Sequence, residues 1–442
     1  MPLLSKAIKE VADLVTNYSL LTSLTIIVVP VLWIVTRCIF RKRRALQPDT
    51  YPPRGHRKLG YTVLDPEWQD KDYQATDGKL GPQTLAKSKV TVKAIVIYPI
   101  KSCSPVMLDH GTIIATGIRY DRRFAFAELV PVTKADREKP NFPETNEHFR
   151  WRFITQREYP LLASVKTEIW IPSEDSVEGS AEFLSGRQMN TKGRSLIVSF
   201  PDSHRRRTMV TFTLSLDGPQ SKIHQKETVQ VWVDYPSAIN VTSEIPGEAL
   251  HKLKTFLSNG KANKLKNMAL FMIDGENESQ RLREVYRCAP KKEDIGYQPV
   301  VGFADAYPLH LLSLGSVRDV EGRLPPDTRL NPLRFRANIY VTGCQAFTED
   351  TWKLIRIGSS NYHVSSRTAR CNMPNVDPTT GIRDSNEPMR AMSEYRRVDQ
   401  GCPRVPCLGM QVTPIEPKGE IRVGDEIEVL EVGEHFYLPW LN

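Results

Sequence analysis

Residues 90–102 read VTVKAIVIYPIKS, and this stretch marks the start of the folded part of the chain. Its alternating β-branched residues predict a strand, which the Tyr-Pro-Ile-Lys turn brings to an end. Further short strands, separated by turn residues, are expected at residues 111–118, 123–130, 152–156, 164–171, 195–200, 208–214 and 229–233. This spacing is typical of a β-barrel or sandwich.

The second half of the sequence mixes helical and strand patterns. Helical periodicity predicts helices at residues 248–257, 311–321, 349–355 and 387–397. The chain then closes with strands in residues 419–432, which read GEIRVGDEIEVLEV. The expected fold class is therefore β-rich α+β, with a β-barrel first and peripheral helices on a second β-barrel core.

Composition excludes several classes of protein. The chain has 442 residues, with 60 Lys and Arg against 51 Asp and Glu, which suits two or three globular domains and excludes a disulfide-stapled mini-protein. Five of the basic residues lie between positions 37 and 44, and the remaining 55 nearly balance the 51 acidic ones. Such a balance leaves no broad positive field, so no nucleic-acid partner is expected.

An apolar segment near the start of the chain predicts a membrane anchor in residues 1–44. No charged residue occurs between Asp13 and Arg37, and a transmembrane helix is expected at about residues 20–40. A cleaved signal peptide is the alternative, but its positive charge would precede the apolar run. The basic flank at residues 41–44 places the body in the cytosol by the positive-inside rule. Residues 45–89, rich in Pro, Gly and charge, are expected to form a flexible linker.

The seven cysteines do not form a recognisable metal or disulfide framework. They are widely spread and include no CxxC pair, so a zinc or iron-sulfur site is not expected. A cytosolic body also implies reduced thiols, so a special cysteine would act as a ligand or nucleophile. The seven are Cys38, Cys103, Cys288, Cys344, Cys371, Cys402 and Cys407.

Four short stretches hold the polar residues that could carry chemistry. They read YPIKSC at 98–103, DRRF at 121–124, FRAN at 335–338 and RCNMPNVDPTTG at 370–381. Turn amides with Lys and Arg side chains suit a phosphate, Asn can pair with the edge of a heterocycle, and a thiolate can bind a soft metal. Each stretch alone is a weak signal, because Asp-Arg pairs and buried cysteines are usually structural.

Taken together and in this order, the four stretches and the closing IRVGD resemble the MOSC family, and within it the mitochondrial amidoxime reducing components. The resemblance implies a MOSC N-terminal β-barrel domain at residues 90–240, a MOSC domain at 241–435 and a short tail at 436–442. It also implies a molybdenum cofactor, a pterin with a terminal phosphate, held between the two domains.

The family's site residues carry over onto matching positions of this chain. The resemblance places Cys371 on the metal as the catalytic ligand, and Arg123 replaces Arg122 if the register slips by one. The cofactor-binding positions that it implies are Lys101, Ser102, Arg122, Asp305, Arg336, Asn338 and Cys371. Asp377 and Gly381 are expected to shape the turn that presents the thiol. Pro374-Asn375 departs from the family's Thr-Thr, which puts the substrate range in question.

The implied activity is the reduction of amidoximes, hydroxylamines and, by extension, nitrite, by oxygen-atom transfer at molybdenum. Cytochrome b5 and NADH-cytochrome b5 reductase are the implied electron donors, because no flavin, haem or iron-sulfur motif is present in the sequence. The implied membrane is the mitochondrial outer membrane, with the endoplasmic reticulum as the alternative. A cofactor carrier or sulfur-transfer protein is the competing interpretation, although the sequence has no pyridoxal-phosphate domain. Cys103, Cys344, Cys402 and Cys407 are expected to be ordinary core or loop residues.

Overall fold

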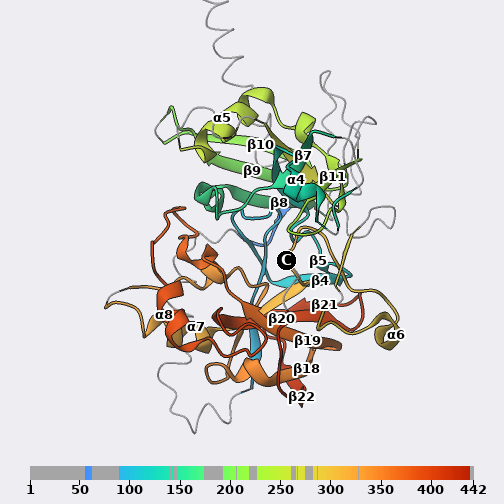
Figure 1. Cartoon of the computed structure of the whole chain (residues 1–442), viewed down its shortest axis with the longest axis vertical. Helices are drawn as coiled ribbons and strands as arrows, with labels where there is room; N and C mark the ends of the chain where they lie inside the picture. The colour runs from blue at the N-terminus through green and yellow to red at the C-terminus, as the bar shows by residue number, and fades with distance from the viewer. Residues whose placement is uncertain are drawn as a thin grey trace, which may run out of the picture. The chain divides into compact units, whose positions relative to one another are not determined.

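Strands make up most of the regular structure, as the ribbon in Figure 1 shows. The computed structural model describes residues 55–61 and 89–438, except for residues 140, 144–146, 174–192, 206, 219–225, 260–264, 266, 274–281, 286 and 327. The described residues all fall in one compact unit, Pro53–Asn442. The β-rich class predicted from the sequence is confirmed.

Five strands close into a barrel, as the spacing of the strand patterns predicts. They are β6 (Phe124–Pro131), β7 (Phe149–Phe153), β11 (Lys226–Gln230), β12 (Ser237–Asn240) and β13 (Met268–Met272). β6 pairs antiparallel with both β7 and β13, and β11 pairs parallel with β7. Side chains of these strands, among them Phe153, Val229 and Phe271, form one buried cluster. The barrel uses β13, which lies beyond residue 240, where the first domain was expected to end.

A four-stranded antiparallel sheet in the order β1-β8-β9-β10 comes from the same part of the chain. Its strands are β1 (His56–Leu59), β8 (Lys166–Pro172), β9 (Ser195–Pro201) and β10 (Met209–Ser215). Helix α5 (Gly247–Leu257), which the sequence predicts, brings Phe256 to within 5.7 Å of Phe200, measured between ring centroids. β1 lies inside the expected linker, and the backbone of β8 pairs with it.

The largest sheet has eight strands in the order β22-β18-β19-β20-β16-β17-β2-β3. The predicted first strand is β2, and it pairs antiparallel with β17, so the start of the folded chain completes a sheet made mainly by its end. The strands are β2 (Thr91–Ile97), β3 (Val106–Leu108), β16 (Leu309–Ser313), β17 (Ile339–Thr342), β18 (Trp352–Ile357), β19 (Ser360–Ala369), β20 (Cys407–Pro414) and β22 (Ile427–Val432).

Small sheets and short helices complete the fold. Strand β21 (Glu420–Arg422) pairs with β4 (His110–Ile114), which pairs with β5 (Gly117–Ile118), and β14 (Arg283–Glu284) pairs with β15 (Val300–Val301). The remaining α-helices are α4 (Lys134–Arg137), α6 (Lys292–Ile295), α7 (Leu314–Glu321) and α8 (Met389–Tyr395). Single 3-10 turns are η1 (Pro160–Ser164), η3 (Thr242–Glu244), η4 (Pro332–Phe335), η5 (Thr348–Thr351) and η6 (Met373–Asn375).

Two predicted helices differ from the structure. The helix predicted at 349–355 is wrong, because η5 leads directly into β18, which pairs with both β19 and β22. The helix predicted at 311–321 begins only at Leu314, since its first residues belong to β16. All five residues of β16 are buried, and an apolar run of this kind cannot be told from a buried helix by periodicity alone.

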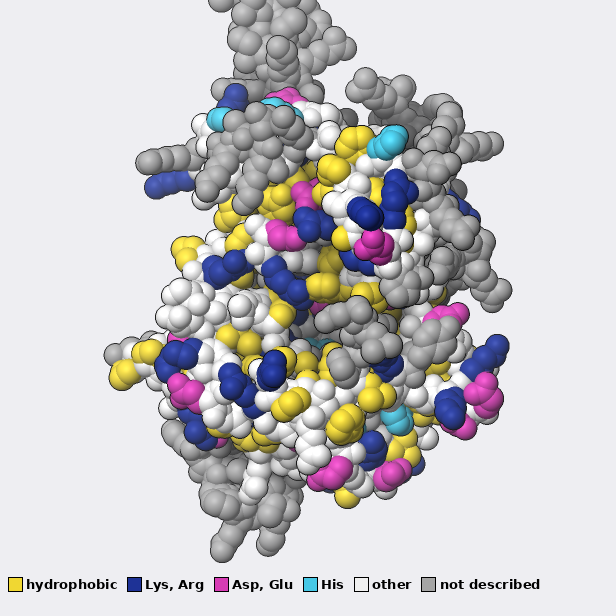
Figure 2. All heavy atoms as spheres, viewed as in Figure 1, with side chains coloured by type: hydrophobic (Ala, Val, Ile, Leu, Met, Phe, Trp, Pro, Cys, Tyr) yellow, Lys and Arg dark blue, Asp and Glu magenta, His cyan; other side chains and the backbone are white. Residues whose placement is uncertain are grey.

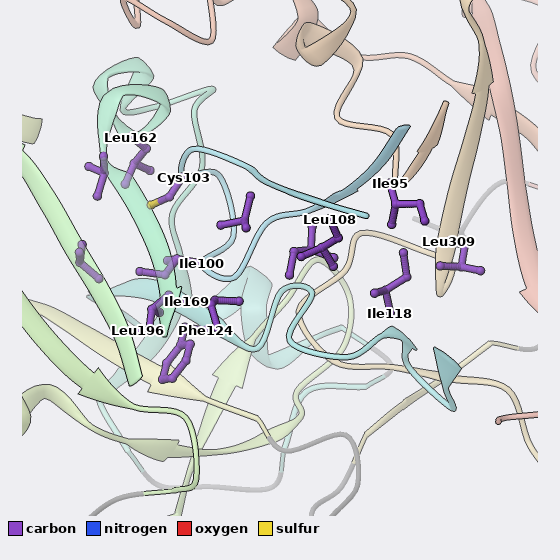
Figure 3. Close-up of a cluster of buried hydrophobic side chains, with 14 of the residues drawn as sticks. Ile95, Ile100, Cys103, Leu108, Ile118, Phe124, Leu162, Ile169, Leu196 and Leu309 are labelled. Carbon is purple, nitrogen blue, oxygen red and sulfur yellow. The ribbon is translucent and has the colours of Figure 1, made fainter. Parts of the chain in front are cut away.

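A continuous core joins the strands of both halves of the described chain. Figure 3 shows part of it, with Phe124 of β6, Ile169 of β8, Ile95 of β2 and Leu309 of β16 among its labelled side chains. Burial of each such aliphatic or aromatic side chain stabilises the fold by roughly 1.5–3 kcal/mol. Cys103 lies in the same core, and burial raises the pKa of its thiol to about 12, which suits the structural role expected for it.

The predicted transmembrane helix at 20–40 lies outside the described residues. Within the residues that are described, no helix is long and apolar enough to cross a membrane. The anchor therefore stays a prediction. On the face drawn in Figure 2, exposed basic and acidic side chains are interspersed, which agrees with the near balance of charge in the sequence.

Glu349, at the start of the chain segment that was mispredicted as a helix, is fully buried. Its Oε1 accepts hydrogen bonds from Ser316 Oγ at 2.6 Å and from the Ser313 backbone N–H at 3.3 Å. Burial raises the pKa of this carboxyl from 4.5 to about 7. Between about pH 4.5 and about pH 7, Glu349 is therefore protonated in the native protein but ionised in the unfolded chain.

Because of this raised pKa, the free energy of unfolding is expected to fall as the pH rises. The contribution of Glu349 is present in full below about pH 4.5 and is lost as the pH rises through about 7. Relative to wild type, Glu349→Gln is expected to gain about 2 kcal/mol in free energy of unfolding between about pH 5.5 and about pH 8. Urea unfolding of both proteins at the two pH values checks this. If the difference in free energy of unfolding between the two proteins is the same at both pH values, the carboxyl is already ionised in the native state.

Candidate functional site

Lys101 and Asp305, which the sequence resemblance places at the site, are in direct contact. Lys101 lies in the turn after β2, and its Nζ donates hydrogen bonds to Asp305 Oδ1 at 2.5 Å and to the Phe303 carbonyl oxygen at 2.8 Å. The lysine side chain is 5% exposed and the aspartate side chain is 53% exposed. Burial lowers the pKa of Lys101 to about 8, so the ammonium is still charged at neutral pH.

Arg122 and Arg336 meet at Tyr98, although they lie far apart in the sequence. Their Cζ atoms are 4.6 Å and 3.9 Å from the centroid of the tyrosine ring. Arg122 Nη2 donates to the Arg336 carbonyl oxygen at 3.0 Å, and Arg336 Nη1 donates to that of Cys103 at 3.0 Å. Both arginines have left-handed backbone, with φ of 45° and 54°. Such conformations cost of order 1 kcal/mol or more each and gather at functional sites.

The alternative residue Arg123 is also buried, but Arg122 is the arginine whose guanidinium contacts Arg336 and Tyr98. Asp121 fixes this arrangement, because its Oδ1 accepts from the Tyr98 backbone N–H at 2.8 Å and its Oδ2 accepts from Arg122 Nη1 at 2.5 Å.

Ser102 and Asn338 lie in the same region, where Ser102 forms a hydrogen bond through its backbone carbonyl and Asn338 through its side-chain amide. Ser102 has a φ of 67°, and its carbonyl oxygen accepts a hydrogen bond from Gln156 Nε2 at 2.7 Å. The Asn338 amide joins strands, because Oδ1 accepts from the His310 backbone N–H and Nδ2 donates to the Val96 carbonyl oxygen. The roles of both residues in cofactor binding stay predictions.

Cys371 lies just after β19, and its thiol is half-buried. Arg370, immediately before it, donates from Nη2 to the Phe335 carbonyl oxygen at 2.9 Å. Asp377 Oδ1 accepts from the backbone N–H groups of Thr379 and Thr380, both at 2.9 Å, so it shapes the following turn as expected. In the same turn Gly381 has a φ of 69°, and an added Cβ would lie 3.1 Å from the Leu161 Cα.

Five cations gather around the Asp305 carboxylate, and we refer to them as the cationic cluster. The members are Lys101, Arg122, Arg283, Arg336 and Arg370. Three carboxylates pair with this cluster, those of Asp121, Asp234 and Asp305. The cluster therefore carries an excess of positive charge, and burial lowers the pKa of Arg336 and Arg370.

Two buried guanidinium donors of this region have no hydrogen-bond partner among the residues that the structure describes. They are Arg336 Nη2 and Arg370 Nε. Burial, together with the charges of Arg370 and Arg122, holds the pKa of His310 well below its usual range, so this imidazole is neutral. Buried polar atoms are normally paired, and an unpaired one costs about 1–3 kcal/mol. Excess positive charge and unpaired donors fit an anionic ligand with several acceptor atoms.

Four residues of the region were not singled out in the sequence. Arg283 donates from Nη2 to the Asp305 carbonyl oxygen at 3.0 Å, and Trp232 donates from Nε1 to Asp305 Oδ1 at 3.2 Å. The Cζ of Arg157 lies 4.2 Å from the Trp232 ring. His310 is the fourth. Only His310 had a usable signal, since it stands five residues after Asp305 in the same apolar stretch.

Within the described ranges, no group of three or more His, Cys, Asp or Glu side chains is placed to hold a metal ion. Family models match two parts of the chain. Residues 89–239 match the MOSC N-terminal beta barrel domain and residues 298–428 match the MOSC domain, which together exceed half of the chain. The chain belongs to the MOSC family.

Curated relatives of this MOSC protein carry two kinds of name. Mitochondrial amidoxime-reducing component 1 of Danio rerio is 33% identical over 162 residues, 37% of this chain and 47% of that protein. Mitochondrial amidoxime reducing component 2 of Rattus norvegicus is 37% identical over 131 residues, 29% of this chain and 38% of that protein. Molybdenum cofactor sulfurase of Arabidopsis thaliana is 23% identical over 316 residues, 70% of this chain and 31% of that protein.

The matches to these relatives are therefore partial, and the chain spans less than half the length of each. Among solved structures, the YUAD protein from Bacillus subtilis is 16% identical and covers 31% of this chain and 71% of that chain. Its TM-score of 0.19 is too low to carry an argument about this MOSC protein.

Proposed function

We propose that this MOSC protein is a molybdenum cofactor-dependent oxidoreductase that reduces N-hydroxylated and N-oxygenated small molecules, namely amidoximes, hydroxylamines and, by extension, nitrite. The observation that carries the proposal is the buried cationic cluster with its unpaired donors, one member of which, Arg370, directly precedes Cys371 in the sequence. The names of the relatives from Danio rerio and Rattus norvegicus supply the substrate class.

The residues present suit the cofactor's charge and donor requirements. Arg336 and Arg370 would offer their unpaired N–H groups to phosphate and pterin acceptors, and Lys101 and Arg122 would add charge. Cys371 would supply a soft thiolate to the metal. When bound, the cofactor supplies two-electron oxygen-atom transfer chemistry at molybdenum, which no side chain of this protein can provide.

The protein's own residues have a positioning role in this proposal. Tyr98 holds the guanidinium groups of Arg122 and Arg336 in place, and Arg283 fixes the backbone at Asp305. Asp305, the carboxylate at the centre of these cations, has a partly exposed side chain, so it would meet a substrate or solvent first.

Electron donors and membrane attachment belong to the same proposal. Cytochrome b5 and NADH-cytochrome b5 reductase would deliver the electrons, and a helix at residues 20–40 would hold the enzyme beside these membrane-bound partners, which raises their effective concentration. The mitochondrial outer membrane is the proposed site, with the endoplasmic reticulum as the alternative.

A cofactor carrier or sulfur-transfer protein is the second candidate. The match to molybdenum cofactor sulfurase favours it, because that alignment covers 70% of this chain, more than either amidoxime-reducing relative covers. Both candidates require the cofactor, so reductase turnover is the property that separates them.

The test is an assay of the full chain, purified from a host that makes the cofactor, with an aromatic amidoxime as substrate and reduced cytochrome b5 as donor. We expect turnover to the amidine that depends on both the protein and the donor. An artificial dye donor in parallel separates a failure of the partner from a failure of the chemistry. Molybdenum-loaded protein without turnover from either donor would favour the carrier.

A further inference from the structure

Two cysteine thiols outside the cationic cluster are in contact with each other. The Sγ atoms of Cys402 and Cys407 lie 3.7 Å apart. Cys407 is the first residue of β20 and is fully buried, whereas Cys402 lies in the preceding loop and is half-buried. The Cys402 sulfur can therefore react with a small solute, and the Cys407 sulfur lies buried in contact with it.

The loop between the two cysteines is held in a fixed shape. The Val405 backbone N–H donates to the Cys402 carbonyl oxygen at 3.0 Å, and Pro403 and Pro406 restrict the residues on either side. The Cys407 N–H donates to the Arg396 carbonyl oxygen at 2.8 Å.

On the Cys402 side, Asp399 organises the backbone. It is buried, and its Oδ1 accepts from the Gly401 N–H at 2.9 Å and from the Tyr437 N–H at 2.8 Å. An added Cβ at Gly401 would lie 1.8 Å from the Tyr437 carbonyl oxygen, so this loop fits closely against the C-terminal segment. Both thiols are thus presented by anchored backbone.

The environment of the pair assigns different roles to the two sulfurs. The contact between the two sulfurs lowers the pKa of Cys402, and the same contact together with burial raises the pKa of Cys407. A thiolate is the reactive form toward oxidants, so Cys402 is the sulfur that reacts first. A disulfide needs the sulfurs to approach to about 2.05 Å, a closure of less than about 2 Å.

We propose that Cys402 and Cys407 form a reversible intrachain disulfide when the protein meets a peroxide. In the first step the Cys402 thiolate attacks one peroxide oxygen, the O–O bond breaks, and a sulfenic acid and water form after proton uptake. In the second step the Cys407 sulfur attacks the sulfenic sulfur and a second water leaves. The two thiols lose two electrons and two hydrogens, and the peroxide is reduced to two waters. A dithiol reductant reverses the reaction.

The pair is connected to the segment that carries Cys371. Cys407 is the cross-strand partner of Ala369, and the Arg370 backbone N–H donates to the Pro406 carbonyl oxygen at 2.9 Å. Closing the disulfide changes the loop to which Arg370 is bonded. This modification site is independent of the proposed function, because its chemistry needs neither the cofactor nor a substrate.

Mass spectrometry of the full chain tests the proposal directly. Trypsin cleaves after Arg397, Arg404 and Lys418, so the two cysteines fall into separate peptides, Val398–Arg404 and Val405–Lys418. After treatment with hydrogen peroxide and blocking of free thiols, these two peptides are expected to appear linked. Dithiothreitol is expected to return both to the alkylatable form.

Matched variants decide the assignment. Cys402→Ser, at a half-buried loop position, is expected to abolish the linked peptides while thermal unfolding stays close to wild type, and Cys371→Ala is expected to leave them unchanged. Two results would overturn the proposal. One is Cys402 accumulating as sulfinic or sulfonic acid with Cys407 still free, and the other is Cys402 linked to any different cysteine.

Discussion

Replacing Cys371 with alanine is expected to slow amidoxime reduction by the cofactor-loaded chain at least about 100-fold. The half-buried thiol directly follows Arg370 of the cationic cluster, and the five members of that cluster themselves have no sulfur to offer a metal. The free energy of unfolding should change by less than about 0.5 kcal/mol, because this side chain packs only partly. Substrate-dependent oxidation of a dye donor gives the rate, and thermal unfolding gives the stability.

Cys288→Ala is the matched control for this variant. Cys288 is also a half-buried free thiol, but its sulfur contacts the Phe436 carbonyl oxygen at 3.5 Å instead of belonging to the site. We expect the control to turn over at the wild-type rate. Full activity in Cys371→Ala would show that Cys371 is not the metal ligand.

The second large effect is expected at Arg336, where function and stability should move in opposite directions. Arg336→Met removes a buried cation with an unpaired Nη2, so the cofactor content of purified protein should fall about tenfold or more. The same change removes repulsion within the cationic cluster, so the cofactor-free protein should be at least as stable as wild type. Molybdenum and pterin analysis gives the first value and urea unfolding of cofactor-free protein gives the second.

Arg396→Met supplies the contrast. Arg396 is equally buried, but its Nη2 donates to Asp350 Oδ2 at 2.6 Å, so its loss leaves a buried carboxylate without its partner. This variant should lose about 3–5 kcal/mol of stability. If Arg336→Met destabilises the cofactor-free protein as strongly, Arg336 is a structural residue and the cluster is not built for an anion.

The sequence motifs identified those site residues that share short turns, and the structure explains why. Lys101 and Arg122 both lie in turns that follow strands. The contacts of Lys101 with Asp305 and of Arg122 with Arg336 join residues that the family resemblance had placed at one site. Trp232 also reaches Asp305, but no local pattern marks it, since that contact depends on how the barrel closes.

Two other features escaped sequence reasoning for different physical reasons. The segment at 349–355 has an apolar spacing that suits a helix, yet cross-strand pairing with β19 and β22 makes it a strand. In the sequence Cys402 and Cys407 look like ordinary cysteines, because a spacing of five residues does not by itself bring two thiols into contact. The fixed shape of the loop between them brings their sulfurs together.

If the cationic cluster binds the molybdenum cofactor, the folded full chain should contain it. Molybdenum and pterin analysis of the protein, purified from a host that makes the cofactor, measures this. We expect near-stoichiometric amounts of both in wild type and a parallel loss of both in Arg336→Met. A folded wild-type chain that contains neither molybdenum nor pterin would contradict binding of the cofactor by this cluster.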